Sequence, residues 1–201
     1  MEYFFYCRDK QGVGDLRWEM AEEHWAFMDR YAEKMIARGP TLTPDGEQAT
    51  GSMHIVDLPD ADAAYEFAFQ EPYYLAGVFD EVLVRRWNNT LGRTMWEFAG
   101  GTAGHRRFLI LAHGGPTRIA DRDVTVEENR RYLADACSEG LIAHGPLLSE
   151  DGADWVGTAS LVELPDRDAA ETLVRQDPFA RAGLYERVEV HDWRFGGRPA
   201  E

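Results

Sequence analysis

The sequence predicts an α+β fold built from two ferredoxin-like βαββαβ repeats whose sheets pack face to face in a barrel-like core. The first observation is an internal duplication: residues 39–87 align with residues 145–193 without a gap, and 20 of the 49 positions are identical. The second is the order of periodicities in each half, which alternates between strand and helix. The third is that two segments, 4–6 and 108–111, are apolar on both sides of the pleat.

Each half is predicted to contain a strand, a helix, a hairpin, a second helix and a final strand. In the first half these elements cover residues 3–8, 17–34, 35–42 paired with 52–58, a helix after Asp60, and 81–87. In the second half they cover residues 107–112, 126–138, 141–148 paired with 156–163, a helix from Asp166, and 187–194. The Pro-Asp-Gly turn at 44–46 indicates a hairpin, and an Asp before an apolar helical run is typical of an N-cap.

The four-stranded sheet of a ferredoxin-like repeat has helices on one face only. Strands that are apolar on both faces therefore need a second cover, and the sheet of the other half is the economical one. We expect three parts in the chain: a first repeat at 1–90, a linker at 91–105 and a second repeat at 106–201.

Composition excludes several classes of function. Lys plus Arg number 21 against 36 Asp plus Glu, a formal net charge of -15, so nucleic acid and anionic membranes are not expected partners. Hydrophobic residues make up 44% of the chain, which is enough to form a folded core. Two cysteines do not make a disulfide framework, and no signal-peptide pattern opens the sequence, so a cytoplasmic location is expected.

Several short motifs recur in the same order in both halves. In the first half they are Gly39-Pro40, Gly51-Ser52, Glu71-Pro72-Tyr73, Ala76-Gly77 and a strand ending in Trp87. The ordered set resembles the YCII-related (YciI-like) proteins, in tandem. The resemblance implies a dimeric α+β barrel, normally assembled from two chains and here from one. It leaves open whether the fused chain is a monomer, as an intrachain pseudo-dimer, or a homodimer.

The resemblance also implies candidate catalytic residues. Family members carry a His early in the first helix and an Asp before the Pro, and a few relatives eliminate halide from chlorinated ring-cleavage or hydroquinone-type substrates. His24 lies within a helical turn of the His position, and Glu71 stands at the Asp position. The second half retains the acid as Asp177 but has Glu-Asn-Arg-Arg at 128–131 in place of the His.

Helix geometry argues against a direct contact between His24 and Glu71. If the two helices of a half start level, the residues are separated by roughly 6 Å along the axis and roughly 8 to 10 Å between axes. A water, a bend in the chain or a residue from the other half would have to close this gap. For Glu71 and Asp177, a turn-forming role before Pro is an alternative, since a carboxylate there bonds backbone N–H groups.

Two hypotheses of function remain. The first is a cofactor-free lyase or isomerase on a small molecule, with His24 as acid or base and Glu71 or Asp177 orienting it. The second is a non-catalytic ligand-binding or regulatory module; a cofactor-free oxygenase is a third possibility. Candidate substrate-binding residues, for which core packing is the alternative, are Trp25, Phe27, Tyr31, Ser52 and Tyr73. No metal site is expected, because the other histidines lack ligand spacing.

Overall fold

The computed structural model describes residues 1–115 and 123–197, without the side chains of residues 123–127 and 130. The chain divides into two compact units. Unit 1 comprises Met1–Trp87 with the C-terminal segment from Trp193, and unit 2 comprises Asn88–Asp192. Unit 2 thus begins at Asn88 and includes residues 91–105, and the chain returns to unit 1 at Trp193.

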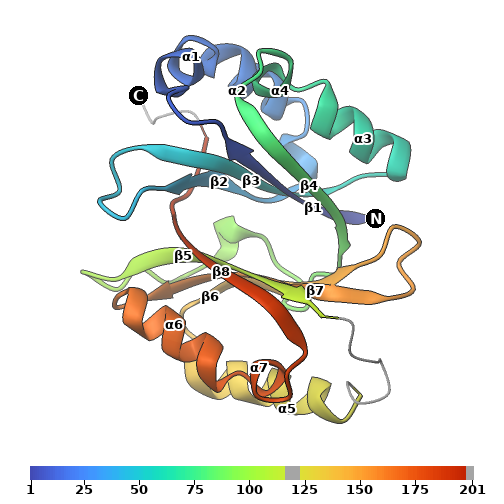
Figure 1. Cartoon of the computed structure of the whole chain (residues 1–201), viewed down its shortest axis with the longest axis vertical. Coiled ribbons are helices and arrows are strands. Elements are labelled where there is room, and N and C mark those ends of the chain that lie inside the picture. Colours follow the sequence, from blue (N-terminus) through green and yellow to red (C-terminus); the bar gives the residue numbers. More distant parts are fainter. Residues whose placement is uncertain (116–122, 198–201) are drawn as a thin grey trace. The chain divides into compact units, whose positions relative to one another are not determined.

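Unit 1 is an antiparallel sheet of four strands in the order β4-β1-β3-β2 with its helices on one face (Figure 1). Its elements are β1 (Glu2–Asp9), α1 (Gly14–Glu19), α2 (Ala21–Asp29), the 3-10 helix η1 (Ala32–Lys34), β2 (Met35–Leu42), β3 (Ala49–Asp57), α3 (Ala61–Phe69), α4 (Pro72–Leu75) and β4 (Phe79–Trp87). This is the predicted ferredoxin-like order.

The core of unit 1 lies between the sheet and the two main helices. Phe5 of β1 packs on Phe67 of α3 with ring centroids 4.6 Å apart, and Met28 of α2 joins the same cluster. Burying side chains of this size contributes roughly 1.5 to 3 kcal/mol each. The alternating side chains Phe4 and Tyr6 point to the other face of the sheet and are also buried, as predicted from the doubly apolar strand.

The first helical region is not the single helix over 17–34 that its spacing predicts. It consists of α1 and α2, which are separated at Met20, followed by η1. α1 has no buried side chain, and its Trp18 is 79% exposed, whereas α2 buries its apolar face. Because the break reorients α1, Arg17 reaches the end of β1 while α2 stays packed on the sheet.

Unit 2 repeats this arrangement, with strand order β8-β5-β7-β6. Its elements are the 3-10 helix η2 (Met95–Glu97), β5 (Arg106–Gly114), α5 (Asp123–Cys137), β6 (Leu141–Leu148), β7 (Trp155–Leu164), α6 (Arg167–Gln176), α7 (Pro178–Arg181) and β8 (Tyr185–Trp193). Met95, in the predicted linker, is buried. The corresponding core packs Phe108, Leu133 and Leu173 between sheet and helices.

The predicted turn and cap residues hold the same positions in both units. The carboxylates of Asp60 and Asp166 accept the backbone N–H groups of Ala63 and Ala169 at 2.8 Å, which caps α3 and α6. Gly46, in the first hairpin, has φ +79°, a conformation in which glycine lacks the strain of a side chain. The repeated cap and turn motifs of the sequence therefore make the same local interactions in both units.

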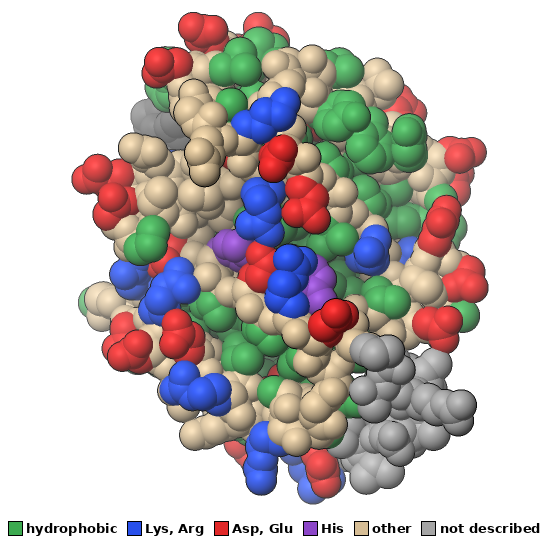
Figure 2. Space-filling model, viewed as in Figure 1, with side chains coloured by type: hydrophobic (Ala, Val, Ile, Leu, Met, Phe, Trp, Pro, Cys, Tyr) green, Lys and Arg blue, Asp and Glu red, His purple; other side chains and the backbone are tan. Residues whose placement is uncertain are grey.

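The surface carries the acidity seen in the composition. Figure 2 shows acidic and basic side chains interspersed over the visible face, with apolar side chains between them. Within the described part of the chain, no helix combines the length and the apolar character that crossing a bilayer requires.

Candidate active site

Unit 1 contains a cavity of about 890 Å³. It lies where α1, α2, β2, β3 and the C-terminal segment meet, and it is large enough for a drug-sized molecule. Its polar wall includes Arg17, His24, Arg38, Ser52 and His54. Its aromatic wall includes Trp18, Trp25, Tyr73 and Phe195.

His24 and Glu71 form a direct hydrogen bond at the edge of this cavity. The distance between Nδ1 of His24 and Oε2 of Glu71 is 2.9 Å, and the two residues are 7% and 3% exposed. The other oxygen of Glu71 accepts the backbone N–H of Tyr74 at 2.9 Å. The Tyr73 ring stacks on the imidazole, with centroids 4.1 Å apart and planes at 13°. The imidazole is therefore fixed by a carboxylate at its edge and by an aromatic ring on its face.

The expectation that the two side chains do not meet directly is wrong. It assumed that Glu71 continues α3, but α3 ends at Phe69 and Glu71 is the N-cap of the short helix α4. The backbone at Glu71 is extended, and α4 packs against α2. A bend of the chain at the end of α3 thus brings the carboxylate to the imidazole.

Burial sets the protonation of the pair. It lowers the pKa of His24 to about 3, and the guanidinium groups of Arg17 and Arg38 act in the same direction. It raises the pKa of Glu71 to about 7, against backbone N–H bonds from Tyr73 and Tyr74. Near neutrality the imidazole is therefore uncharged, and Glu71 is close to the midpoint of its titration.

Arg17 is a cation in the cavity wall that sequence reasoning missed. Its guanidinium contacts both oxygens of Asp9 at 2.8 and 3.0 Å and donates to Oγ of Ser52 at 2.7 Å. It also lies over the Tyr73 ring, with Cζ 4.6 Å from the centroid. Burial raises the pKa of Asp9 to about 6, opposed by Arg17. The break at Met20 puts Arg17 and His24 on different helices, so no helical spacing in the sequence signalled that the two share a wall.

The predicted substrate-binding residues divide into two groups. Ser52, Trp25 and Tyr73 line the cavity. Phe27 and Tyr31 lie instead in the core between α2, α3 and the sheet, where each packs against Phe67. Successive side chains of α2 are rotated by about 100° around the helix axis, so residues close to His24 in sequence point in different directions.

His54 and Arg38 are further cavity residues that the sequence did not single out. His54 lies on β3, with its ring centroid 5.8 Å from that of His24. Burial lowers its pKa well below the usual value, so it too is a neutral imidazole. Among the residues described, no three His, Cys, Asp or Glu side chains are grouped so that they could hold a metal ion.

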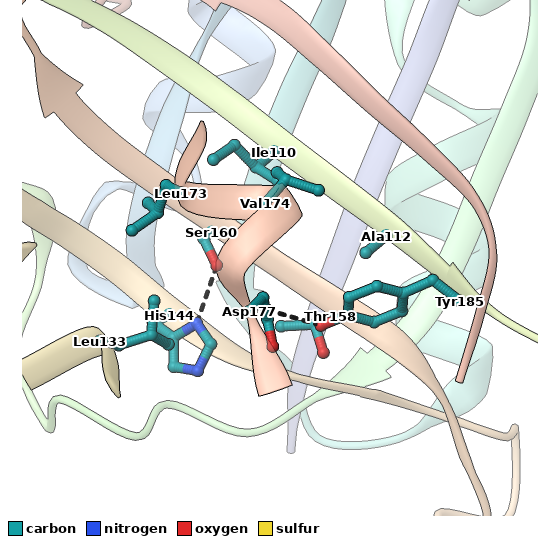
Figure 3. A pocket seen from close by; sticks show the side chains of 10 residues that line it. All are labelled: Ile110, Ala112, Leu133, His144, Thr158, Ser160, Leu173, Val174, Asp177 and Tyr185. Atoms are coloured by element: carbon teal, nitrogen blue, oxygen red, sulfur yellow. Dashed lines mark hydrogen bonds between the residues drawn. The ribbon is translucent and has the colours of Figure 1, made fainter. Parts of the chain in front are cut away.

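Unit 2 has the same framework without the imidazole. Asn129 takes the place of His24 and donates to Oδ1 of Asp177 at 2.8 Å, so the amide and acid repeat the contact of His24 and Glu71. The other oxygen of Asp177 accepts the hydroxyl of Tyr185 at 3.1 Å. The described residues there enclose about 20 Å³, roughly the room for one water (Figure 3). His144, the counterpart of Arg38, is bonded to Ser160 at 2.8 Å.

Comparison with known proteins agrees with this duplicated arrangement. The model of the YCII-related domain matches the chain twice, at residues 1–88 and 106–194. The chain belongs to the YCII-related family.

Relatives of this YCII-related chain match either one repeat or the whole fold. An uncharacterised protein of Haemophilus influenzae is 28% identical over 92 residues, which cover 42% of this chain and 94% of that protein. The 5-chloro-2-hydroxyhydroquinone dehydrochlorinase of Burkholderia phenoliruptrix AC1100 is 28% identical over 44% of this chain and 94% of its own, with a TM-score of 0.42. A mutant chlorite dismutase of Candidatus Nitrospira defluvii, 10% identical, covers 97% of this chain and 91% of its own with a TM-score of 0.62.

The whole-chain likeness shows fold alone. It confirms the predicted fold class of this YCII-related chain: α+β, with two ferredoxin-like repeats in the dimeric α+β barrel class. Proteins solved as enzymes share this fold, as the chlorite dismutases do.

The carboxylates proposed from the family pattern have different surroundings in the YCII-related repeats. Glu71 is bonded to His24, and Asp177 is bonded to Asn129, to the Phe179 N–H at 2.8 Å and to Tyr185. Both also cap the short helix that follows, so the turn-forming role exists in each unit. Only Glu71 combines the cap with a contact to an imidazole.

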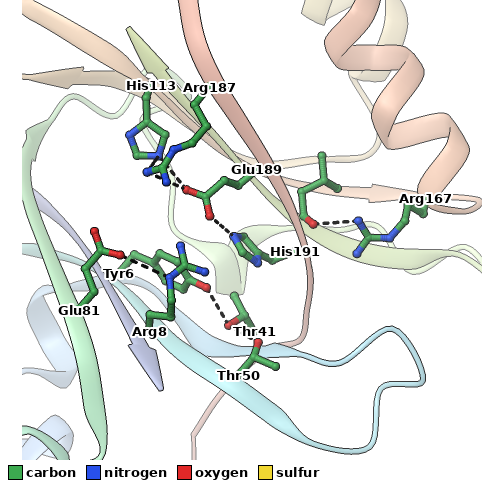
Figure 4. Close-up of polar contacts among 11 residues, drawn as sticks. Tyr6, Arg8, Thr41, Thr50, Glu81, His113, Arg167, Arg187, Glu189 and His191 are labelled. Atoms are coloured by element: carbon green, nitrogen blue, oxygen red, sulfur yellow. Dashed lines mark hydrogen bonds and ion pairs between the residues drawn. The ribbon is translucent and has the colours of Figure 1, made fainter. Parts of the chain in front are cut away.

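A second polar cluster of the YCII-related chain lies on the helix-free face of the unit 2 sheet. The carboxylate of Glu189 contacts Nε2 of His113 at 2.9 Å, Nε2 of His191 at 3.2 Å and Arg187 at 3.2 Å (Figure 4). The Glu189 carboxylate thus has nitrogens of three side chains beside it, and the Arg187 guanidinium also lies 3.1 Å from Nε2 of His113. This pattern is typical of a structural network, in which polar groups satisfy one another.

Proposed function

We propose that this chain is an acid–base enzyme of the lyase or isomerase type that acts on a small molecule in the cavity of unit 1. His24 transfers the proton, and Glu71 orients the imidazole and balances its charge. The proposal rests chiefly on one observation, the 2.9 Å bond between Nδ1 of His24 and Glu71 at the wall of a cavity of about 890 Å³. No cofactor is required, because an imidazole and a carboxylate suffice for proton transfer.

We assign different roles to the two ring nitrogens of His24. When Glu71 is ionised it accepts the Nδ1–H of His24, which fixes the tautomer and leaves the lone pair on Nε2. Nε2 has no hydrogen-bond partner in the described ranges 1–115 and 123–197, and the imidazole lines the cavity. A C–H or O–H group of a bound molecule at Nε2 would lose its proton there.

The Glu71 carboxylate then stabilises the imidazolium that forms. Transfer of the proton from Nε2 to a neighbouring atom of the same molecule completes an isomerisation. Departure of a leaving group with the released electron pair completes an elimination. Both outcomes use the same two side chains, so the architecture supports the reaction type and leaves the choice to the substrate.

The test is proton exchange in D₂O, followed by proton NMR, with a panel of enolisable ketones and β-substituted carbonyl compounds. We expect His24→Gln to lower the rate of exchange or elimination by roughly 10²- to 10⁴-fold, the usual contribution of a general acid or base. The wild-type rate should rise with pH through about 7, because ionised Glu71 is the form that accepts Nδ1–H.

Unit 2 supplies the matched control. Asp177→Asn changes the equivalent acid where no imidazole is present, and should leave the rate unchanged. An unchanged rate in His24→Gln would refute the assignment. Binding of panel compounds without exchange would favour the ligand-binding alternative, with which the low exposure of His24, 7%, is also compatible.

A further inference from the structure

The C-terminal segment, defined as Arg194–Gly197, forms one wall of the unit 1 cavity. It follows β2: the Arg194 N–H donates to the Pro40 carbonyl at 3.3 Å and the Gly196 N–H donates to the Arg38 carbonyl at 3.0 Å. At Gly39 a Cβ would overlap the carbonyl oxygen of Arg194, so glycine permits the close approach. Backbone hydrogen bonds and close packing therefore hold the segment against β2.

Unit 2 has an equivalent segment, which places a side chain against the core where the unit 1 segment has a glycine. The Asn88 N–H donates to the Pro146 carbonyl at 3.4 Å, and the Thr90 N–H donates to the His144 carbonyl at 3.1 Å, which reproduces the two bonds of the C-terminal segment. The next residue, Leu91, packs against the core of unit 2. Its counterpart in unit 1 is Gly197, which has no side chain to occupy the space.

The open cavity of unit 1 is rich in positive charge. Its lining contains Arg17, Arg38, Arg194 and Lys10 against one acid, Glu47. Asp9, behind the wall, offsets part of the Arg17 charge, and Asp29 lies 3.7 Å from Nη1 of Arg38 and offsets part of the Arg38 charge. Such a concentration is unusual in a chain of net charge -15, and a guanidinium held in place binds a carboxylate or enolate oxygen with little loss of freedom. The chemistry favours an anion.

The aromatic lining adds a preference for shape. The rings of Trp25, Tyr73 and Phe195 offer flat apolar surface, and Phe195 is braced edge-on against Trp193 with centroids 5.3 Å apart. Flat rings bind flat ligands by stacking and burial.

We propose that the unit 1 cavity binds a small planar anion, with Arg38 as its anion-binding residue and the C-terminal segment as the wall that sets ligand size. This names the substrate class of the proposed function, and the claim that the ligand is a substrate rests on that function. The binding of a planar anion does not depend on that function, so each of the two claims can be refuted without the other.

Calorimetric titration with four probes tests the inference: benzoate, 2-naphthoate and their neutral amides. We expect both anions to bind the wild-type protein at least roughly tenfold more tightly than the amides, as charge-assisted hydrogen bonds are the stronger kind. Arg38→Gln should remove most of this preference. Phe195→Ala should raise the affinity for 2-naphthoate relative to benzoate by roughly threefold or more, because a side chain leaves the wall.

Two control variants test whether the effects are local. Arg175→Gln removes an exposed cation of α6, and Trp96→Ala removes an exposed ring in unit 2; both should match wild type. Equal affinity for acids and amides, or no measurable heat with either anion, would overturn the anion site. An unchanged ratio of naphthoate to benzoate in Phe195→Ala, in a variant with native circular dichroism, would overturn the role of the wall. Probe binding with normal selectivity but no proton exchange would contradict only the proposed function.

Discussion

At the residue scale, the site holds a hydrogen-bonded pair of ionisable side chains whose pKa values burial shifts away from their ordinary values. His24 and Glu71 are buried, and burial disfavours the imidazolium and the carboxylate alike. The pair therefore exists near neutrality as a neutral imidazole beside a carboxyl group with a pKa of about 7. A carboxyl group so balanced changes charge in the pH range in which proteins work, which suits proton transfer.

The same burial predicts a cost in stability. The Glu71 carboxyl has a pKa of about 7 when folded and an ordinary value of 4.5, so between these values the folded chain holds a proton that the unfolded chain has released. Its contribution to the free energy of unfolding is full below pH 4.5, falls as pH rises, and is lost above about pH 7. Glu71→Gln, of similar shape, has no such dependence.

Urea unfolding between pH 5 and pH 8 measures this contribution. We expect the free energy of unfolding of wild type to fall by about 1 to 3 kcal/mol relative to Glu71→Gln across this range. Both proteins keep His24 and Asp9, so only the part of the Asp9 shift that comes from the Glu71 charge remains in the difference, together with Glu71 itself. Parallel curves for the two proteins would show that Glu71 ionises normally in the folded state.

Single residues also show what the sequence could and could not reveal. The family pattern assigns a place in the sequence to each of four site residues, which are His24, Glu71, Ser52 and Tyr73. Arg17 was missed, because its place in the wall depends on the break at Met20 and on its ion pair with Asp9 from β1. No local pattern encodes such long-range contacts.

At the element scale, the order of helices and strands was predictable because the caps and turns that separate them depend on local interactions. Asp60 and Asp166 cap helices, and the hairpin glycines adopt left-handed backbone, each through interactions within a few residues. The wrong expectation for the distance from His24 to Glu71 arose, in contrast, from a feature that is not local. It depended on α3 ending two residues before Glu71, and helix ends are set by packing that sequence periodicity does not contain.

The approach of β2 to the C-terminal segment gives a prediction at this scale. Gly39 has ordinary backbone dihedrals, but a Cβ would overlap the Arg194 carbonyl and press on the Trp193 ring. We expect Gly39→Ala to lower the free energy of unfolding by about 1 to 3 kcal/mol, the usual cost of overpacking, in thermal or urea denaturation.

Gly14→Ala provides the matched control. Gly14 starts α1, and no atom lies within 4 Å of the position its Cβ would take. Alanine there should be neutral or slightly stabilising, since it favours helix. If Gly39→Ala were as stable as Gly14→Ala, the C-terminal segment would not be held against β2 as the structure has it.

At the scale of the whole molecule, the two units share their packing but differ in the residues around the equivalent polar contact. Both units keep the sheet order, the caps and an amide or imidazole bonded to an acid before Pro. They differ in what surrounds that contact: unit 1 has His24, a glycine at 197 and a cavity of about 890 Å³, whereas the described part of unit 2 has Asn129, Leu91 and about 20 Å³. On the proposed function, the candidate site therefore belongs to unit 1 alone.

This asymmetry predicts one binding site per chain. Titration of 2-naphthoate by calorimetry should give a stoichiometry of about one, since the unit 2 pocket, at about 20 Å³, has room for roughly one water and not for a ring. Arg38→Gln should weaken that single isotherm, whereas His144→Gln, at the equivalent position of unit 2, should leave it as in wild type. Two equal sites per chain, or equal loss of binding in the two variants, would mean that both repeats retained the function and that the differences at Asn129 and Leu91 are neutral.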